Sequence, residues 1–338
     1  MSLYRTELRR LVKRRFVRYL TLAGLLVLVA VAIGMFVTNE RIGPAQRAAA
    51  EQAAERDYRQ NVESAQQYRA ECERVAATGA TSERGFPADC STITPTPRES
   101  FQAQWYLPAT FDFQEEFSTA LVIFAAVLAL VVLLAGASFV GAEWSSGGMM
   151  NLLLWQPQRL RVLLTKLAAL LTGVLGLAVV AMAAWTAAFW GIASQRGSTA
   201  GMTSGVWQSF GLTGLRAAAL VLIAAALGFG LASLGRHTAL ALGGVLGVLV
   251  IGQFGVGMLL SMANVRFVEA WLLPTYLLAW MEKKVTLQNY DACQASYTGN
   301  CEAVTMDITW QDSSVLLSVS LVLVLGAALW TMRRRDIT

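Results

Sequence analysis

The side chains best suited to act on another molecule lie between two apolar stretches, at Glu143, Trp144, Arg159 and Lys166. Carboxylate and guanidinium groups at the ends of apolar helices can form ion pairs with a soluble protein. A tryptophan prefers the boundary between lipid and water. This pattern indicates docking and the transfer of force, and not the making of bonds.

The segment 141–166 that carries these charges predicts a short amphipathic helix. Gly147 relaxes the backbone where the chain leaves the preceding apolar run. Leu153 belongs to a Leu-rich stretch, and Pro157 ends it. The alternative is a tight connecting loop without a special function.

The remaining sequence offers little for catalysis. The chain has a single histidine, His237, and its histidine and cysteines form no cluster that predicts a metal site. The pattern Gly-x-x-x-x-Gly-Lys-Ser/Thr, which binds phosphates, does not occur. We therefore expect a chain that is not an enzyme and holds no metal or cofactor, so that any ATP would be hydrolysed by another chain.

The elements that must position these residues are membrane helices. The chain of 338 residues is 55% hydrophobic and 14% charged, with a mean hydropathy of +0.50, whereas soluble domains are about 25% charged. A bilayer-spanning helix needs about 20 apolar residues. Runs of that kind predict an all-α polytopic membrane protein with six transmembrane helices, at 19–37, 117–140, 167–190, 217–235, 238–265 and 313–332.

The distribution of charge predicts the orientation. Six spans leave 1–18, 141–166, 236–237 and 333–338 on one side, where basic residues far outnumber acidic ones. The positive-inside rule then places both termini in the cytoplasm, with the chain in the cell membrane and the first span an uncleaved anchor. We expect no nucleic-acid binding, because no nucleic-acid module accompanies the basic N-terminus.

Residues 2–18 have apolar side chains at helical spacing between basic ones, Leu8 and Leu11 among them. This predicts an amphipathic helix in the inner membrane interface, in contact with lipid. The alternative is an orientation signal alone.

Residues 38–116 predict an outer helical insert. A polar stretch, 45–77, has charges of opposite sign four residues apart and indicates one or two helices. A breaker-rich stretch, 78–97, and an aromatic-rich one, 101–117, follow. The insert could be a structural cap, or it could bind a partner or gate a substrate.

All four cysteines fall on the outer side in this topology. Cys72 and Cys90 lie in the insert, and Cys293 and Cys301 lie in 266–312. An exterior location favours disulfides. Three pairings are formally open, of which the two local ones, within each segment, are favoured over crossed pairs or free thiols.

The segment 266–312 contains a short apolar stretch, 267–280, that Pro274 interrupts. It predicts a re-entrant or interfacial helical hairpin before the last span. A seventh span is the alternative, but it would place the cluster 333–335 outside. Residues 191–216 are expected to form an outer loop.

Few polar residues fall in or beside the spans. Arg216, expected at the outer end of 217–235, could reach the headgroups or contact a substrate. Gln253 could line a pathway or form an interhelical hydrogen bond. Gly243, Gly247 and Gly255 share a helix face and predict close helix packing, within the subunit or across a dimer.

These features together resemble the ABC-2 type permeases, the membrane subunits of ATP-binding-cassette exporters. In that family an acid, an aromatic residue, a glycine, a Leu-rich stretch, Pro-x-Arg and Lys-Leu join the second and third spans. The matching positions here are Glu143, Trp144, Gly147, 152–154, Pro157, Arg159, Lys166 and Leu167. Gly148 and Met149 depart from the Thr-Leu of many relatives. The long insert looks like a lineage feature of actinobacteria.

The resemblance implies that 141–166 is a coupling helix seated in a cleft of an ABC ATPase. The coupling residues would be Glu143, Trp144, Gly147, Leu153, Pro157 and Arg159. It also implies two ATPase copies holding ATP and Mg, a homodimer or a heterodimer with a related permease, and export of a hydrophobic or amphipathic cargo. The competing hypothesis is an ATPase-coupled envelope sensor whose insert binds a ligand without transport.

Overall fold

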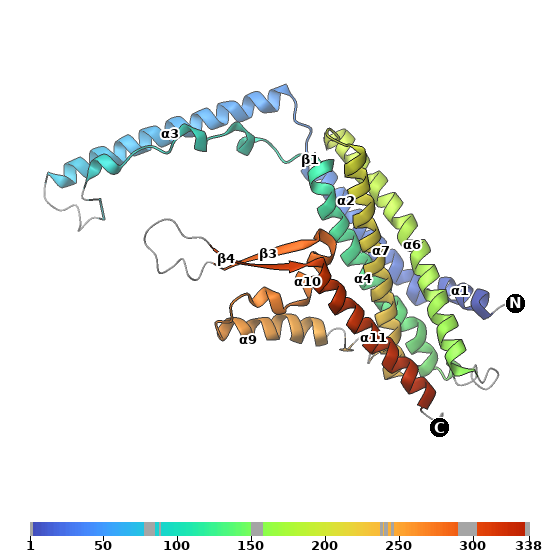
Figure 1. The fold of residues 1–338 in the computed structure, drawn as a ribbon. Coiled ribbons are helices and arrows are strands. Elements are labelled where there is room, and N and C mark those ends of the chain that lie inside the picture. The colour runs from blue at the N-terminus through green and yellow to red at the C-terminus, as the bar shows by residue number, and fades with distance from the viewer. Residues whose placement is uncertain are drawn as a thin grey trace. The chain divides into compact units, whose positions relative to one another are not determined.

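The computed structural model describes residues 3–77, 85–87, 89–149, 158–236, 239, 243–244, 247–289 and 303–334. The chain divides into two compact units (Figure 1). Unit 1 contains Met1–Ile33, Gln114–Trp190 and Ala200–Thr338, and unit 2 contains Gly34–Phe113 and Gly191–Thr199.

Long apolar helices build unit 1. Helix α1 (Leu3–Lys13) precedes α2 (Arg15–Thr38), α4 (Phe113–Ser145), α6 (Arg159–Arg196), α7 (Ser204–Gly235) and α11 (Trp310–Arg334). The last five are long and apolar enough to cross a membrane. This fits a mainly helical, polytopic membrane protein. Helix α1 is separate from α2, and its place in the membrane interface stays a prediction.

The expected fifth span, 238–265, is described only in part. Its described residues include a π-helical stretch, η5 (Val248–Gly255), and a short helix, α9 (Val256–Met262). Among the described residues here, the apolar helix Val250–Met262 is shorter than a span requires. A sixth crossing therefore stays a prediction.

The helices are longer than the apolar runs predicted. Helix α4 continues to Ser145 and α6 begins at Arg159, so the charged residues expected in a loop lie largely on helix ends. Helix α7 begins at Ser204, within the expected outer loop, and Arg216 lies inside that helix. Apolarity marks the length of a span within lipid, whereas hydrogen bonding continues the helix beyond it.

The structure adds two strands to the helices expected in 266–312, of which 290–302 lie outside the described residues. After η6 (Val268–Trp271) and α10 (Leu273–Glu282), strands β3 (Lys284–Asn289) and β4 (Val304–Thr309) form an antiparallel hairpin, pairing Lys284 with Thr309. Alternating exposure along β3 and its β-branched residues favour a strand. Pro274 lies in the first turn of α10, which begins at Leu273, and does not break a helix; proline suits a first turn.

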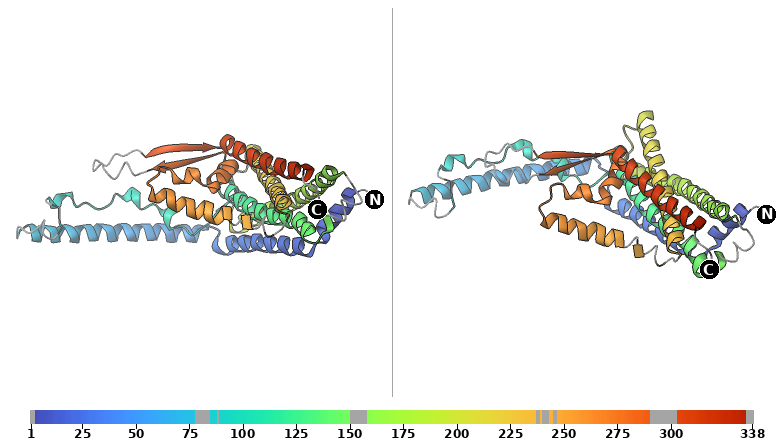
Figure 2. Two further views of the ribbon diagram at one scale, coloured as in Figure 1. Left: turned by 90° about the horizontal axis from the view of Figure 1, so that it is seen from below. Right: turned by 60° about the horizontal axis from the view of Figure 1, so that its bottom comes forward.

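Close backbone contact joins α4 to α7, which run side by side in Figures 1 and 2. A Cβ added at Gly228 would overlap the carbonyl group of Leu133, and one at Gly136 would lie 2.5 Å from the Ala225 carbonyl oxygen. Small residues allow helices to approach this closely where lipid provides no hydrophobic drive. Helix α11 packs on α7 as well.

Unit 2 is built on one polar helix, α3 (Pro44–Ala76). At its beginning the Gln46 side chain accepts a hydrogen bond from the Gly43 amide at 3.1 Å. The chain then returns along α3 through η2 (Cys90–Thr92), η3 (Arg98–Ser100) and η4 (Ala103–Tyr106). The short parallel pair β1 (Phe111–Asp112) and β2 (Gly197–Ser198) closes the unit.

A disulfide fastens this return to the helix. Cys72 and Cys90 are bonded, 18 residues apart in sequence, which confirms that predicted local pair. Along the same face Asn61 accepts a hydrogen bond from the Thr96 amide at 2.8 Å. Cys293 and Cys301 lie outside the described residues, so their pairing stays a prediction.

Candidate functional site

Charged side chains from three helices of unit 1 meet at Lys166, on the first turns of α6. Its ammonium nitrogen lies 2.7 Å from Glu7 Oε2 on α1 and 2.6 Å from Glu143 Oε2 on α4. The side chains of Lys166 and Glu7 are fully buried, and that of Glu143 is 12% exposed. One buried cation thus bridges two carboxylates from different helices.

Two arginines complete this charged cluster. Arg14 Nη2 lies 3.2 Å from Glu143 Oε1, and Arg14 Nη1 donates to the Ser138 carbonyl at 2.7 Å. Arg10 Nη1 lies 3.1 Å from Glu7 Oε1. Burial lowers the pKa of the Arg14 guanidinium below its usual value, and the neighbouring carboxylates of Glu143 and Glu7 oppose that shift. Arginine remains charged at neutral pH in any case.

An aromatic ring lies beneath the cations. The Phe139 centroid is 5.3 Å from the Arg14 guanidinium carbon and 5.4 Å from the Lys166 nitrogen. Cations at this distance interact favourably with the ring face. The cluster is therefore paired and covered, as buried charge must be to avoid a large desolvation penalty.

The sequence around α1 explains how Glu7 reaches α6. Leu8 and Leu11 sit against Gly173, where an added Cβ would lie 3.4 Å and 2.7 Å from their methyl groups. The hydroxyls of Tyr4 and Thr172 are 2.7 Å apart. The apolar face of α1 thus packs on α6, and the adjoining acid meets Lys166.

Trp144, beside Glu143, connects the same helix end to α7 and α11. Its ring lies 5.0 Å from the guanidinium carbon of Arg236, the C-cap residue of α7. A cavity of about 10 Å³ adjoins it, lined also by Leu163, Ser233 and Met332. The indole nitrogen is buried and has no hydrogen-bond partner among the described residues. A cavity of this size can hold one water molecule.

The structure describes some of the predicted coupling residues and not others. Glu143 and Trp144 lie on the last turns of α4, and Arg159 begins α6. Gly147 has a φ of 71°, a conformation that suits glycine. Leu153 and Pro157 lie outside the described residues. We expected Glu143 to face a partner, and the structure instead places it against Lys166 and Arg14 of its own chain.

Sequence reasoning missed Glu7 and Arg14. A signal for Glu7 was present, because it is the only acid among the first 39 residues and stands among many cations. Lys166 likewise stands alone between Arg161 and Arg196. An isolated charge of each sign, each beside an apolar run, predicts a pair more strongly than either does alone.

The predicted pathway residues lie elsewhere in unit 1. Arg216 lies with its guanidinium carbon 5.7 Å from the Trp310 ring, and its carbonyl accepts from the Trp280 indole at 2.9 Å. Arg216 Nη1 and Gln253 Oε1 are buried without hydrogen-bond partners among the described residues. Buried polar atoms without protein partners are candidates for contact with a ligand or water.

The glycines expected to pack closely are open in the structure. A Cβ added at Gly243 or Gly247 would meet no described atom within 4 Å, and one at Gly255 would meet only Ile251 of its own turn, at 3.8 Å. Their predicted contact with another helix therefore has no partner in the described part of this subunit.

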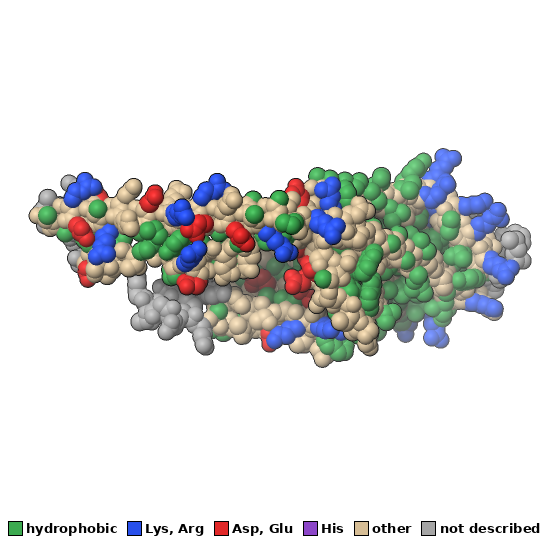
Figure 3. Space-filling view, turned by 90° about the horizontal axis from the view of Figure 1, so that it is seen from above, with side chains coloured by type: hydrophobic (Ala, Val, Ile, Leu, Met, Phe, Trp, Pro, Cys, Tyr) green, Lys and Arg blue, Asp and Glu red, His purple; other side chains and the backbone are tan. Residues whose placement is uncertain are grey.

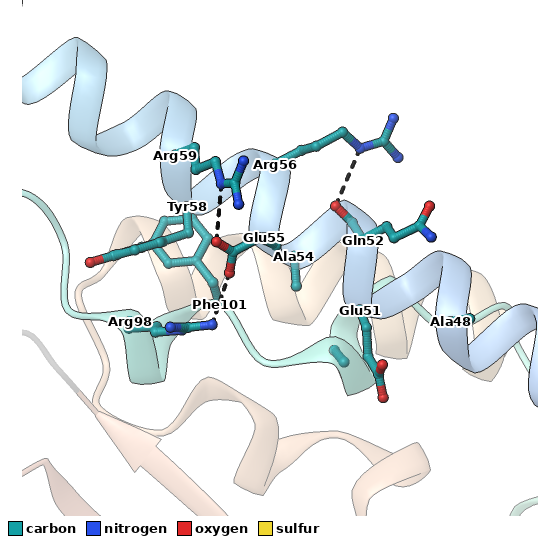
Figure 4. A pocket seen from close by; sticks show the side chains of 11 residues that line it. Ala48, Glu51, Gln52, Ala54, Glu55, Arg56, Tyr58, Arg59, Arg98 and Phe101 are labelled. Atoms are coloured by element: carbon teal, nitrogen blue, oxygen red, sulfur yellow. Dashed lines mark hydrogen bonds and ion pairs between the residues drawn. The ribbon is translucent and has the colours of Figure 1, made fainter.

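Unit 2 has a groove of its own, of about 800 Å³, between α3 and the returning chain (Figure 4). Glu55 lies at its wall, paired with Arg59 at 3.1 Å and Arg98 at 2.8 Å. The Arg98 guanidinium lies over the Tyr58 ring, which also contacts Phe101 edge-on. Mixed charges and aromatic rings could receive a ligand here.

The family comparison covers nearly the whole chain. A family model described as "ABC-2 family transporter protein" matches residues 1–336. No curated protein matches the chain significantly.

Proposed function

The chain belongs to the ABC-2 family of transporter proteins, and from this premise we propose that it is the permease subunit of an ATP-driven exporter. The family is a membrane transport component and not itself a catalyst. ATP and Mg would be held by a separate ABC ATPase. The permease would convert the closure of two such ATPase subunits into movement of its spans.

The charged cluster at Lys166 is the observation that carries this proposal. It fastens the end of α4, the beginning of α6 and helix α1 through ion pairs of 2.6–3.2 Å. A push on the connection between α4 and α6 would then move three helices together. Loosely held helix ends would absorb the same push without passing it on.

The docking surface in this proposal is the tip of the α4–α6 connection. Ser145, Ser146 and Arg161 are exposed there, and Leu164 is 49% exposed. Glu143 and Trp144 act from behind this surface by holding the helix end. The remaining coupling residues of the proposal are Gly147, Leu153, Pro157 and Arg159.

Two copies of the chain, or this chain and a related permease, would pair and carry two ATPase subunits. The stretch η5–α9 offers an apolar face for pairing, since Ile251, Phe254 and Met262 are each at least 70% exposed. The open glycines Gly243 and Gly247 come just before this stretch in the sequence. Such an apolar face is equally suited to contact with lipid.

The proposed orientation has both termini in the cytoplasm of a cell-membrane protein and unit 2 outside. The Cys72–Cys90 disulfide supports an oxidising surrounding for unit 2. The cargo would be hydrophobic or amphipathic, because the spans carry few charges. Arg216 and Gln253, whose buried atoms lack described partners, are the candidate contacts along its path.

Coexpression with the ABC ATPase that copurifies with the chain tests this function. Replacing 150–157 by a Gly-Ser linker of equal length should reduce permease-dependent ATPase activity at least fivefold. The same replacement at 78–84, in unit 2, serves as the matched control and should leave it unchanged. Failure of any ABC ATPase to copurify, or equal activity of both replacements, would contradict the proposal.

The groove in unit 2 favours one alternative, an ATPase-coupled sensor of the cell envelope. In a sensor, the ligand would bind beside Glu55 and Arg98, and nothing would cross the membrane. Deleting 45–100 separates the two functions. A sensor would lose all regulation of the ATPase, whereas a permease would retain ATPase stimulation and part of its efflux.

A further inference from the structure

A basic groove lies beside the charged cluster, at α1 and the end of α4. It has a volume of about 510 Å³, and four of the seven residues that line it are cations. They come from α1 and the residue after it, while Glu143 and Gly148 belong to the end of α4 and the turn beyond. The lining residues are Thr6, Arg9, Arg10, Lys13, Arg14, Glu143 and Gly148.

The charges of this groove do not balance. Arg10 is paired with Glu7, and Arg14 is paired with Glu143. Both oxygens of Glu143 are already engaged, by Arg14 and Lys166. Arg9 and Lys13, one helical turn apart, have no ion-pair partner among the described residues. The groove therefore presents two positive charges that no described acid neutralises.

The position of α1 relative to the membrane surface decides what kind of anion can reach the groove. Tyr4 and Leu11 contact Thr172 and Gly173, which lie within the apolar run of α6 and not beyond its end. Next to these cations, Val12 on α1 is 63% exposed, and Phe16, in the first turn of α2, is 51% exposed. Apolar side chains beside cations on one surface helix are the pattern of a helix seated at the headgroup level of a bilayer.

Figure 3 shows Lys and Arg side chains gathered at one end of unit 1, beside a surface of hydrophobic side chains. A phospholipid fits such a border, because its acyl chains can cover the apolar side chains while its phosphate meets the cations. A soluble acidic protein would leave Val12 and Phe16 uncovered.

We propose that this groove binds the phosphate of an anionic phospholipid of the cytoplasmic leaflet. Arg9 and Lys13 supply the ion pairs, and the Thr6 hydroxyl donates a further hydrogen bond. Because the groove is lined from both α1 and α4, an occupied site would bridge the two helices next to Lys166. Anionic lipid would then stabilise the end of the transporter that the ATPase is proposed to grip.

The test uses the purified full chain, without an ATPase, in neutral detergent micelles. Native mass spectrometry counts bound phosphatidylglycerol against bound phosphatidylcholine at equal concentrations. Arg9→Gln with Lys13→Gln should lower phosphatidylglycerol binding at least fivefold. The matched control, Arg15→Gln with Arg18→Gln, removes the same charge from exposed positions on α2 and should retain it.

Two additions make the outcome decisive. Arg9→Lys with Lys13→Arg keeps the charge and should restore binding, and lipid-free melting temperatures establish that each variant is folded. Equal loss of phosphatidylglycerol in the groove and control variants would overturn the proposal. So would protection by millimolar inorganic phosphate without lipid selectivity, which indicates a free-anion site. Unchanged phosphatidylglycerol binding by the groove variant would overturn it as well.

Discussion

At the scale of single residues, Lys166 decides how the helix ends are held. A lysine whose side chain is fully buried must keep its charge paired or lose it, since an unpaired ammonium is strongly disfavoured away from water. Two carboxylates at 2.6 and 2.7 Å keep it paired. Such a network fixes one arrangement of the helices more than it adds net stability.

Lys166→Met should therefore lower the free energy of unfolding by about 3–5 kcal/mol, because it leaves two carboxylates without their central cation. Adding Glu7→Gln should restore part of the loss by removing one stranded charge. Thermal unfolding in detergent measures both. Lys284→Met, which breaks an exposed pair with Asp307, is the control and should barely change the melting temperature. Equal effects at both lysines would count against the buried network.

At the scale of elements, the α4–α7 contact depends on the absence of a side chain at Gly228. Gly228→Ala should destabilise the protein by about 1–3 kcal/mol, because the new methyl group would overlap the Leu133 carbonyl. Gly211→Ala on the same helix has open space around it and should be neutral or stabilising. Melting temperatures of the two variants in one detergent compare them directly, and a neutral Gly228→Ala would refute the close contact.

The disulfide should stabilise unit 2 alone. Replacing Cys72 and Cys90 by serine should lower the free energy of unfolding of that unit by about 3 kcal/mol, given the 18-residue separation. Limited proteolysis across a temperature series should show earlier cleavage in 44–107 with unchanged cleavage in unit 1. Replacing Cys293 and Cys301 is the control, and earlier cleavage of 44–107 in that variant instead would contradict the assignment.

Sequence predicted the elements better than their ends or their partners. Apolar runs located five long helices, because a span must be apolar over its whole length. They did not locate α7's beginning at Ser204, since hydrogen bonding continues a helix through residues that lipid does not require. The hairpin β3–β4 was missed because short alternation is a weak signal beside an apolar stretch.

For the site, too, the sequence predicted which residues matter better than it predicted their partners. Glu143, Trp144 and Arg159 were selected by type and spacing, but whether an acid faces a partner or its own chain depends on the packing of distant segments. Glu7 lies 159 residues before Lys166, and no local pattern joins them. Tertiary pairing of this kind follows from how α1 packs against α6, through Leu8, Leu11 and Gly173.

At the scale of the whole molecule, the number of crossings fixes the sides of the two termini. With six spans both termini lie in the cytoplasm, whereas five spans would place them on opposite sides. A fluorescent protein that matures only in the cytoplasm should therefore glow when fused to either end. Alkaline phosphatase, active only outside, should work when inserted after residue 100. Fluorescence from one terminus alone would rule out a crossing at 238–265.

The central claim is that the connection between α4 and α6 meets an ABC ATPase, with the cluster at Lys166 holding it from behind. The most direct measurement uses a photo-crosslinking amino acid in cells that also express the copurifying ATPase. One variant carries it at Ser146, on that connection, and a second carries it at Gln311, in the first turn of α11. We predict an adduct with the ATPase from Ser146 and none from Gln311. An adduct from Gln311 alone, or none from Ser146 in a complex that copurifies intact, would contradict it.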